Sequence, residues 1–319
     1  MRSARIPLPA LLMGALLLTA CGSPKADSLG GGPVRPPSSG SPNASGGPSC
    51  APRPSGTAPA ATGDSAADPG KDGVRITAQG RDGADYCAEY EVTHHEAQAL
   101  TFTVGFAFLT DSGTVLTTTT ETVPSVRPGR TVKRTVTTST VPPAARGAAR
   151  VKITKVRSVP SAEAPSQDGP CPPSGVRVYA DDGDAAMGLR AVSLHLENCG
   201  TGTHRLNGYP QLQLLDARHK PVDTVTVLRG GNAIATGTGA DGEPQPLELK
   251  TGERAYAVMV WHNTVTEAGD PVNAPYARVW AEPGAAPVTV TSEFDLGTTG
   301  RLGVGPWKKD ETRAAAPSR

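Results

Sequence analysis

The chain of 319 residues contains 37 Gly and 31 Pro, and only 4% of its residues are aromatic. Its 31 basic residues nearly balance its 30 acidic residues. This balance argues against a dedicated nucleic-acid binder, which needs a basic field to release counterions. All thirteen Phe, Trp and Tyr residues lie at Tyr86 or later. The first quarter of the chain therefore lacks the side chains of a normal core, and we expect folded structure to start near residue 72.

Residues 1–20 have the features of a secretory signal peptide. Arg2 and Arg5 form a basic start, and residues 6–18 form an uncharged apolar stretch. That stretch is shorter than the ~20 apolar residues that a transmembrane helix needs. It ends in Leu18-Thr19-Ala20-Cys21, which resembles the bacterial lipobox. An ordinary secretory peptide with an incidental cysteine is the alternative.

The lipobox resemblance implies that Cys21 becomes the acylated first residue of the mature chain. Two acyl chains on one residue anchor a protein stably, whereas one chain holds it only marginally. Loss of the two leader arginines leaves 29 basic and 30 acidic residues. We therefore expect an extracytoplasmic protein on the outer face of the cell membrane, attached by lipid rather than by surface charge.

Residues 21–71 read as the lipid anchor followed by a disordered tether. From residue 22 to residue 70, 37 of 49 residues are Gly, Pro, Ser or Ala. Such a stretch buries too little apolar area to offset the entropy of ordering it. A flexible chain of this length spans about 35–42 Å, enough to lift folded domains away from a membrane.

Residues 72–158 are predicted to form a small antiparallel β-sandwich. Apolar and polar residues alternate around Tyr86–Val92 and Leu100–Phe108, the pattern of half-buried strands. Asp111-Ser112-Gly113 signals a hairpin turn, and the run Thr117–Thr120 suits the solvent face of a strand. The segment from Thr103 to Leu116 resembles the FxLYD-type immunoglobulin-like domains of bacterial surface proteins.

A second linker is expected at residues 159–170, and a second β-sandwich at residues 171–307. No sustained period of 3.6 residues is present, so helix should be scarce. Residues 308–319 are expected to be a disordered tail. The fold class is thus all-β, with two immunoglobulin-like antiparallel β-sandwiches after the tether. Strands of the second sandwich are expected near Val176–Val178, Leu189–Leu196, Leu212–Leu215, Val222–Leu228, Leu247–Leu249, Tyr256–Trp261, Tyr276–Trp280, Val288–Val290 and Leu302–Trp307.

The order of landmarks in residues 171–307 resembles the actinobacterial family called domain of unknown function 4232. The landmarks are an opening Cys171, a strand ending in Glu197-Asn198, the run Gly208-Tyr209-Pro210, and the closing segment Leu302–Trp307. The resemblance implies a secreted or lipid-anchored β-sandwich with no established activity. This chain departs from the family at His204, where members often place a cysteine, so the family's disulfide pattern transfers only in part.

The sequence shows no set of catalytic, cofactor-binding or metal-binding residues. Gly237–Gly242 matches G-x-G-x-x-G, but Glu243-Pro244-Gln245-Pro246 excludes the helix that a dinucleotide site needs, so we predict a loop. His94-His95-Glu96 lacks a third ligand at zinc-like spacing and is interpreted as a solvated turn. We therefore predict no catalytic residues, no cofactor and no metal.

The three tryptophans bear on whether the second sandwich binds glycan. Trp261, Trp280 and Trp307 are expected mainly in the core, and if exposed they would form a sugar-stacking surface. The leading interpretation is a non-enzymatic, lipid-anchored cell-surface protein that binds an envelope protein or glycan. The alternatives are a lipoprotein that binds a small molecule, a metal or cell-wall glycan, and an enzyme whose site the sequence does not reveal.

Four cysteines remain once Cys21 is acylated, and an even number in an exported chain implies disulfides. Four cysteines allow three pairings. The domain boundaries favour Cys171–Cys199, because both lie in the second sandwich, and this leaves Cys50–Cys87.

Overall fold

The computed structural model describes Cys50 and residues 70–82, 85–110, 112–138, 150–267 and 269–311. Throughout these residues the chain is nearly all β, with one short 3-10 helix, η2 (Ser161–Glu163). The expected signal peptide, Cys21 and nearly all of the tether lie outside the described residues. Within the described ranges, no helix has the length and apolar character that crossing a membrane requires.

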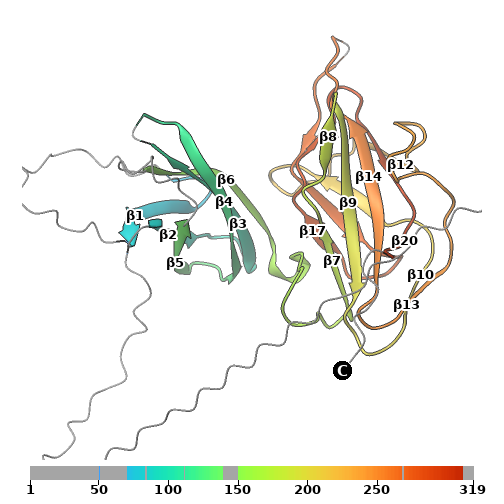
Figure 1. The fold of residues 1–319 in the computed structure, drawn as a ribbon, viewed down its shortest axis with the longest axis horizontal. Coiled ribbons are helices and arrows are strands. Elements are labelled where there is room, and N and C mark those ends of the chain that lie inside the picture. The colour runs from blue at the N-terminus through green and yellow to red at the C-terminus, as the bar shows by residue number, and fades with distance from the viewer. Residues whose placement is uncertain are drawn as a thin grey trace, which may run out of the picture. The chain divides into compact units, whose positions relative to one another are not determined.

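The first sandwich pairs two three-stranded antiparallel sheets around one core (Figure 1). The strand order is β1-β2-β5 in one sheet and β4-β3-β6 in the other. The strands are β1 (Val74–Asp82), β2 (Asp85–Thr93), β3 (Leu100–Leu109), β4 (Val115–Val126), β5 (Thr131–Thr138) and β6 (Arg150–Pro160).

Alternation of side chains produces this core. Every second residue of β3 is a large apolar group, and Phe106 and Phe108 are fully buried. The Phe106 ring contacts Tyr90 of β2, with 4.9 Å between ring centroids. On β4, Thr118 and Thr120 are exposed while Thr119 is half-buried, because successive residues of a strand face opposite sides.

The second sandwich is built on a larger sheet with the order β12-β19-β14-β9-β7, to which β8 and β20 add at β9 and β14. A three-stranded sheet, β11-β16-β17, and two short pairs, β10-β13 and β15-β18, complete it. The strands are β7 (Val176–Ala180), β8 (Asp184–Ala186), β9 (Leu189–Asn198), β10 (His204–Leu206), β11 (Gln211–Leu215), β12 (Thr226–Arg229), β13 (Leu247–Leu249), β14 (Arg254–His262), β15 (Asn273–Ala274), β16 (Tyr276–Trp280), β17 (Val288–Val290), β18 (Phe294–Asp295), β19 (Arg301–Val304) and β20 (Lys308–Lys309).

One strand pair departs from the expected antiparallel arrangement. Strand β12 runs parallel to β19, with Val227 opposite Leu302. The strand expected from Val222 is also shorter than predicted, since β12 starts at Thr226. Alternation marks a strand but not its direction, which depends here on partners about 75 residues apart in sequence.

The segment that joins the sandwiches makes specific contacts. Strand β6 continues to Pro160, and η2 follows directly. Val159 is 3% exposed and packs with Leu215 and Tyr276 of the second sandwich. The first residues of the expected linker are therefore ordered: β6 and η2 continue through residue 163, and Val159 packs on the second sandwich.

The solvated turn expected at His94-His95-Glu96 is wrong for His94. This side chain is 8% exposed, and its Nε2 lies 2.7 Å from the carbonyl oxygen of Val126. Its ring also lies against Phe102, with 5.7 Å between ring centroids. His95 and Glu96 are exposed, as expected. Sequence spacing gave no sign that the neighbouring β4 would cover only the first of the three residues.

Candidate functional site

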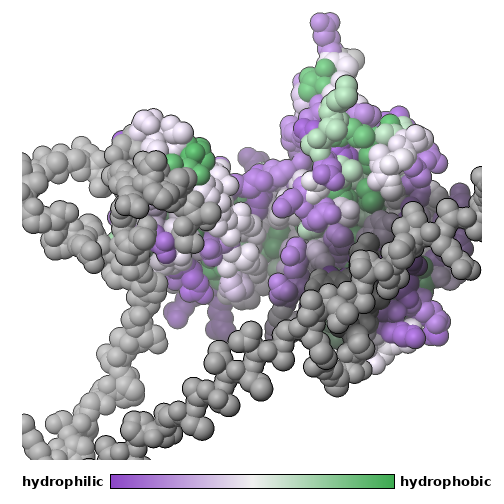
Figure 2. Space-filling view, in the orientation of Figure 1, coloured by the Kyte–Doolittle hydropathy of each residue, from purple (hydrophilic) through white to green (hydrophobic). Residues whose placement is uncertain are grey.

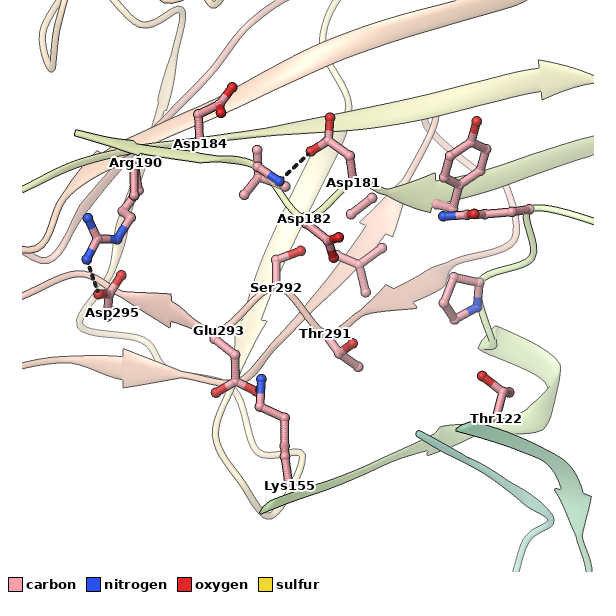
Figure 3. A pocket seen from close by; sticks show the side chains of 18 of the residues that line it. Thr122, Lys155, Asp181, Asp182, Asp184, Arg190, Thr291, Ser292, Glu293 and Asp295 are labelled. Atoms are coloured by element: carbon pink, nitrogen blue, oxygen red, sulfur yellow. Dashed lines mark hydrogen bonds and ion pairs between the residues drawn. The ribbon is translucent and has the colours of Figure 1, made fainter. Parts of the chain in front are cut away.

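A polar groove of about 910 Å³ lies against the second sandwich where the chain leaves β7 (Figure 3). Figure 3 shows Asp181, Asp182 and Asp184 on the ribbon above Ser292 and Glu293. Lys155 of the first sandwich also lines the groove. The groove is therefore formed by residues of both folded parts of the chain.

Asp181 organises the wall of the groove between β7 and β8. Its Oδ1 accepts hydrogen bonds from the backbone amides of Gly183, at 3.1 Å, and Ser193, at 2.9 Å. Its Oδ2 lies 3.3 Å from Nε2 of His195, whose ring stacks on Tyr179. Gly183 has φ of +69°, and a Cβ there would lie 2.5 Å from the carbonyl oxygen of Ala191. The tight backbone path thus requires glycine and places the flanking carboxylates at the groove.

Asp295 is a second fixed carboxylate that lines the groove. Its Oδ1 accepts a hydrogen bond from the indole Nε1 of the buried Trp261 at 2.9 Å. Its Oδ2 accepts from Nδ2 of Asn263 at 3.0 Å and lies 3.4 Å from a guanidinium nitrogen of Arg190. Three donors from β9, β14 and the loop after β14 therefore hold this carboxylate in one orientation.

Glu293 carries the ion pairs that join the two sandwiches at the groove. Its two carboxylate oxygens accept from Nε of Arg157 at 2.5 Å and from NH2 of Arg157 at 2.8 Å. Nζ of Lys155 lies 3.1 Å from Oε1. Burial alone would raise the pKa of Glu293, but the bonds from Arg157 and Lys155 outweigh it, and the pKa is lowered.

The groove is strongly acidic. Six carboxylates line it, with two cations, Lys155 and Arg190. Asp182 and Asp184 are exposed, and no hydrogen bond or ion pair holds either carboxylate within the described part of the chain. An arrangement of fixed carboxylates and free ones suits a ligand that is cationic or rich in hydrogen-bond donors.

We expect the Glu293 contact to weaken in acid. A carboxyl whose folded pKa is lowered adds stability above its unfolded pKa, near 4.5, and this stability is lost as the pH falls through the folded value. The ion pair is partly exposed, so its loss should cost about 1–2 kcal/mol. Glu293→Gln should therefore remove that part of the acid sensitivity, measured as the free energy of unfolding between pH 7 and pH ~3.

The matched control is Glu248→Gln, because Glu248 pairs with Arg205 on an open surface, where the two side chains are 65% and 77% exposed. This variant should follow the unsubstituted chain at every pH. Equal pH profiles for Glu293→Gln and Glu248→Gln would contradict the assignment of this acid sensitivity to the ion pairs of Glu293.

The structure places the remaining sequence-predicted residues as follows. Cys171 pairs with Cys199 and Cys50 pairs with Cys87, the pairing that the domain boundaries favoured. Gly237–Gly242 forms a loop, closed by a hydrogen bond from the amide of Gly237 to Oδ2 of Asp241. No group of three or more His, Cys, Asp and Glu side chains could hold a metal ion among the residues described.

The tryptophans do not form a common surface. Trp261 and Trp307 are 1% and 2% exposed, and the indole of Trp307 donates to the carbonyl oxygen of Ala281 at 2.8 Å. Trp280 alone is half-buried. The core position expected for these rings is therefore confirmed for Trp261 and Trp307.

Sequence reasoning missed the residues of the groove. Asp181, Asp182 and Asp184 follow directly after a strand, and such a run of acids at a strand end was an available signal. Glu293 and Lys155 carried no such signal, because their proximity depends on the packing of two separate sandwiches.

Comparison with known families supports the family resemblance expected for the second sandwich. Residues 171–308 match the family model described as Domain of unknown function (DUF4232). The match covers the C-terminal domain and stops short of half the chain. A comparison with curated proteins finds no match.

Proposed function

We propose that this protein is a non-enzymatic binding protein of the bacterial envelope, held on the outer face of the cell membrane through acylated Cys21. The charged start, the apolar run and the motif ending in Cys21 support the anchor together. The Gly/Pro/Ser/Ala-rich stretch that follows supports a tether between the anchor and the folded parts.

The acidic groove is the observation that carries the binding role. Two of its carboxylates are oriented: Asp295 by hydrogen bonds from Trp261 and Asn263, and Asp181 by the backbone of β9. Such preorganisation lowers the entropy lost when a partner binds. Asp182 and Asp184 stay open to solvent. The partner chemistry that fits best is an envelope protein that presents a basic segment, whose charges the groove complements.

Binding at the groove is tested with purified chain and envelope extract from the producing organism. We expect a basic envelope protein to be captured, and the double variant Asp182→Asn/Asp184→Asn to lose at least about tenfold in affinity for it. Glu248→Gln is the control that removes an exposed carboxylate elsewhere. Capture that is equal for all three chains would rule out the groove as the binding site, and capture of wall glycan instead would favour the glycan-binding alternative.

Cys21→Ala should release the protein from the membrane. Without the thiol no diacylglyceryl thioether forms, and the mature chain carries no other lipid attachment in this proposal. Metabolic labelling with a fatty-acid probe should mark the unsubstituted chain and leave the variant unmarked and in the medium. An unlabelled, freely secreted wild-type chain would overturn the anchor.

A further inference from the structure

The turn between β8 and β9 presents a methionine where a polar residue or glycine is usual. Met187 and Gly188 form the two-residue connection between Ala186 and Leu189, with φ of +49° and +84°. Positive φ at both positions defines a type I′ hairpin turn, in which Asn-Gly is favoured. The Met187 side chain is fully exposed. The chain therefore accepts both backbone strain and an unburied apolar side chain at this position.

A second exposed apolar side chain lies in a loop that is hydrogen-bonded to the same turn. Val265 is 62% exposed in the loop that follows β14. That loop is held in place: the amide of Thr266 donates to Oγ1 of Thr298 at 3.1 Å, and the amide of Asn263 donates to the carbonyl oxygen of Gly188 at 2.9 Å. The exposure of Met187 and Val265 is thus a property of an ordered surface.

This surface, which we call the Met187 end, also carries exposed carboxylates. It comprises two segments linked by the hydrogen bond from Asn263 to Gly188. In β8 and its turn, Asp184 and Met187 are exposed, and in the loop after β14, Val265, Glu267 and Asp270 are exposed. Figure 2 shows hydrophobic (green) and hydrophilic (purple) atoms side by side in the region where β8 lies in Figure 1. Acidic groups around an apolar centre repel an anionic lipid surface, and they also repel a second Met187 end. A complementary partner must offer apolar contact within a basic surrounding.

The first sandwich of this chain has such a surface. Val115 of β4 is 56% exposed, and it lies beside Leu109 of β3, which in turn lies beside Arg150 of β6. Phe108 is buried, so Leu109 faces the outer side of the sheet. Lys152 follows on β6, and neither Arg150 nor Lys152 has an ion-pair partner within the described residues. We call Val115, Leu109 and Arg150 the Val115 row.

The charges of the two sandwiches also differ in sign. Residues 72–158 contain 11 basic and 8 acidic residues, and residues 171–307 contain 10 basic and 15 acidic residues. A molecule with one basic and one acidic half favours head-to-tail contact between copies over contact between like halves.

We propose that the Met187 end of one chain docks on the Val115 row of a second copy. Met187 packs on Val115 and Leu109, while Asp184, Glu267 and Asp270 lie near Arg150 and Lys152. The two surfaces differ, so the contact is heterologous and leaves one free end on each chain. Copies anchored on one membrane, as proposed above, would assemble into rows. The contact itself does not depend on the anchor, so it is testable in solution.

The test uses the full chain with Cys21→Ala, so that the only unpaired thiols are those introduced. Chains with Met187→Cys and with Val115→Cys are mixed and mildly oxidised. We expect disulfide dimers that join position 187 to position 115, in about tenfold higher yield than in the control mixture of Val227→Cys with Val115→Cys. Val227 is a suitable control because it is also an exposed valine, at 39%.

Added salt and a charge-reversal variant test the electrostatic contribution to this contact between copies. Raising NaCl from about 0.05 M to about 0.5 M, or adding Lys152→Glu, should lower the yield of the 187–115 dimer severalfold. A yield equal to that of the Val227 control, dimers joining position 187 to position 187, or a yield unchanged by salt would each overturn the proposal.

Met187→Asn supplies a test without introduced cysteines. Asparagine adopts the left-handed conformation more readily, so the unfolding midpoint should rise by about 2 °C. The same variant should reduce concentration-dependent association in sedimentation experiments. Unchanged association with a raised midpoint would show that Met187 does not form the contact.

Discussion

Trp261→Ala is expected to destabilise the second sandwich by about 3–5 kcal/mol. The indole is 1% exposed on the central strand β14, with its ring centroid 5.1 Å from that of Phe294. Truncation leaves a cavity that the surrounding sheets fill only in part. It also removes the Nε1 donor to Asp295, whose carboxylate is then held by Asn263 and Arg190 alone. The loss should therefore combine a packing cost with the cost of an underpaired carboxylate.

Two further variants separate these costs. Trp261→Phe keeps an aromatic ring in the core but removes the indole donor, so it should cost distinctly less than the alanine variant. Trp280→Ala is the matched control. Trp280 is the last residue of β16 and is half-buried, so its truncation opens no enclosed cavity. The free energy of unfolding from denaturant titration measures all three. Equal losses for Trp261→Ala and Trp280→Ala would contradict the placement of Trp261 in the core.

The strands of the first sandwich could be predicted because their periodicity is strong. Leu100–Phe108 and Tyr86–Val92 alternate over their whole length, and both become central strands whose inner faces are fully buried. Period-2 alternation is a local signal, so it can be recognised in the sequence without knowing which strands pair in the sheet. The same signal identified β9, β11, β14, β16 and β17 in the second sandwich.

Several short strands were not predicted, because two or three residues rarely show a period, although β13 and β17, of three residues each, were predicted. Strands β8, β15, β18 and β20 span only two or three residues each, and their pairing depends on neighbours that the fold supplies. Strand β8 exists because Met187 and Gly188 turn the chain back onto β9. Its turn residues lack the Asn-Gly or Asp-Gly signature that marks a hairpin in sequence.

The groove could be predicted only in part, for a related reason. The run Asp181-Asp182-Gly183-Asp184 is local and visible in sequence, whereas Asp295 and Glu293 are more than 100 residues away. Glu293 has φ of +54°, a conformation unusual for a glutamate, and no sequence pattern marks it. Its ion pair with Arg157 joins the two sandwiches, and nothing in either sequence indicates that these two residues lie next to each other.

The two disulfides should differ in their resistance to reduction. Cys50 and Cys87 are both fully buried, whereas Cys171 is exposed and Cys199 is half-buried. Thiol–disulfide exchange needs access of the attacking thiolate to a sulfur atom. Under native conditions a mild reductant should therefore open Cys171–Cys199 first, and Cys50–Cys87 should open only when the first sandwich unfolds.

Each opening should also lower stability considerably. The bonded cysteines are 28 and 37 residues apart, and loops of this size contribute about 3–4 kcal/mol each in the chain-entropy account. Cys171→Ser/Cys199→Ser should therefore lower the free energy of unfolding of the second sandwich by that amount and leave Cys50–Cys87 intact. Timed alkylation followed by peptide mapping gives the order of opening. Thiols at 50 and 87 that are labelled before those at 171 and 199, or a peptide joining Cys87 to Cys171, would show that the chain pairs or packs its cysteines differently.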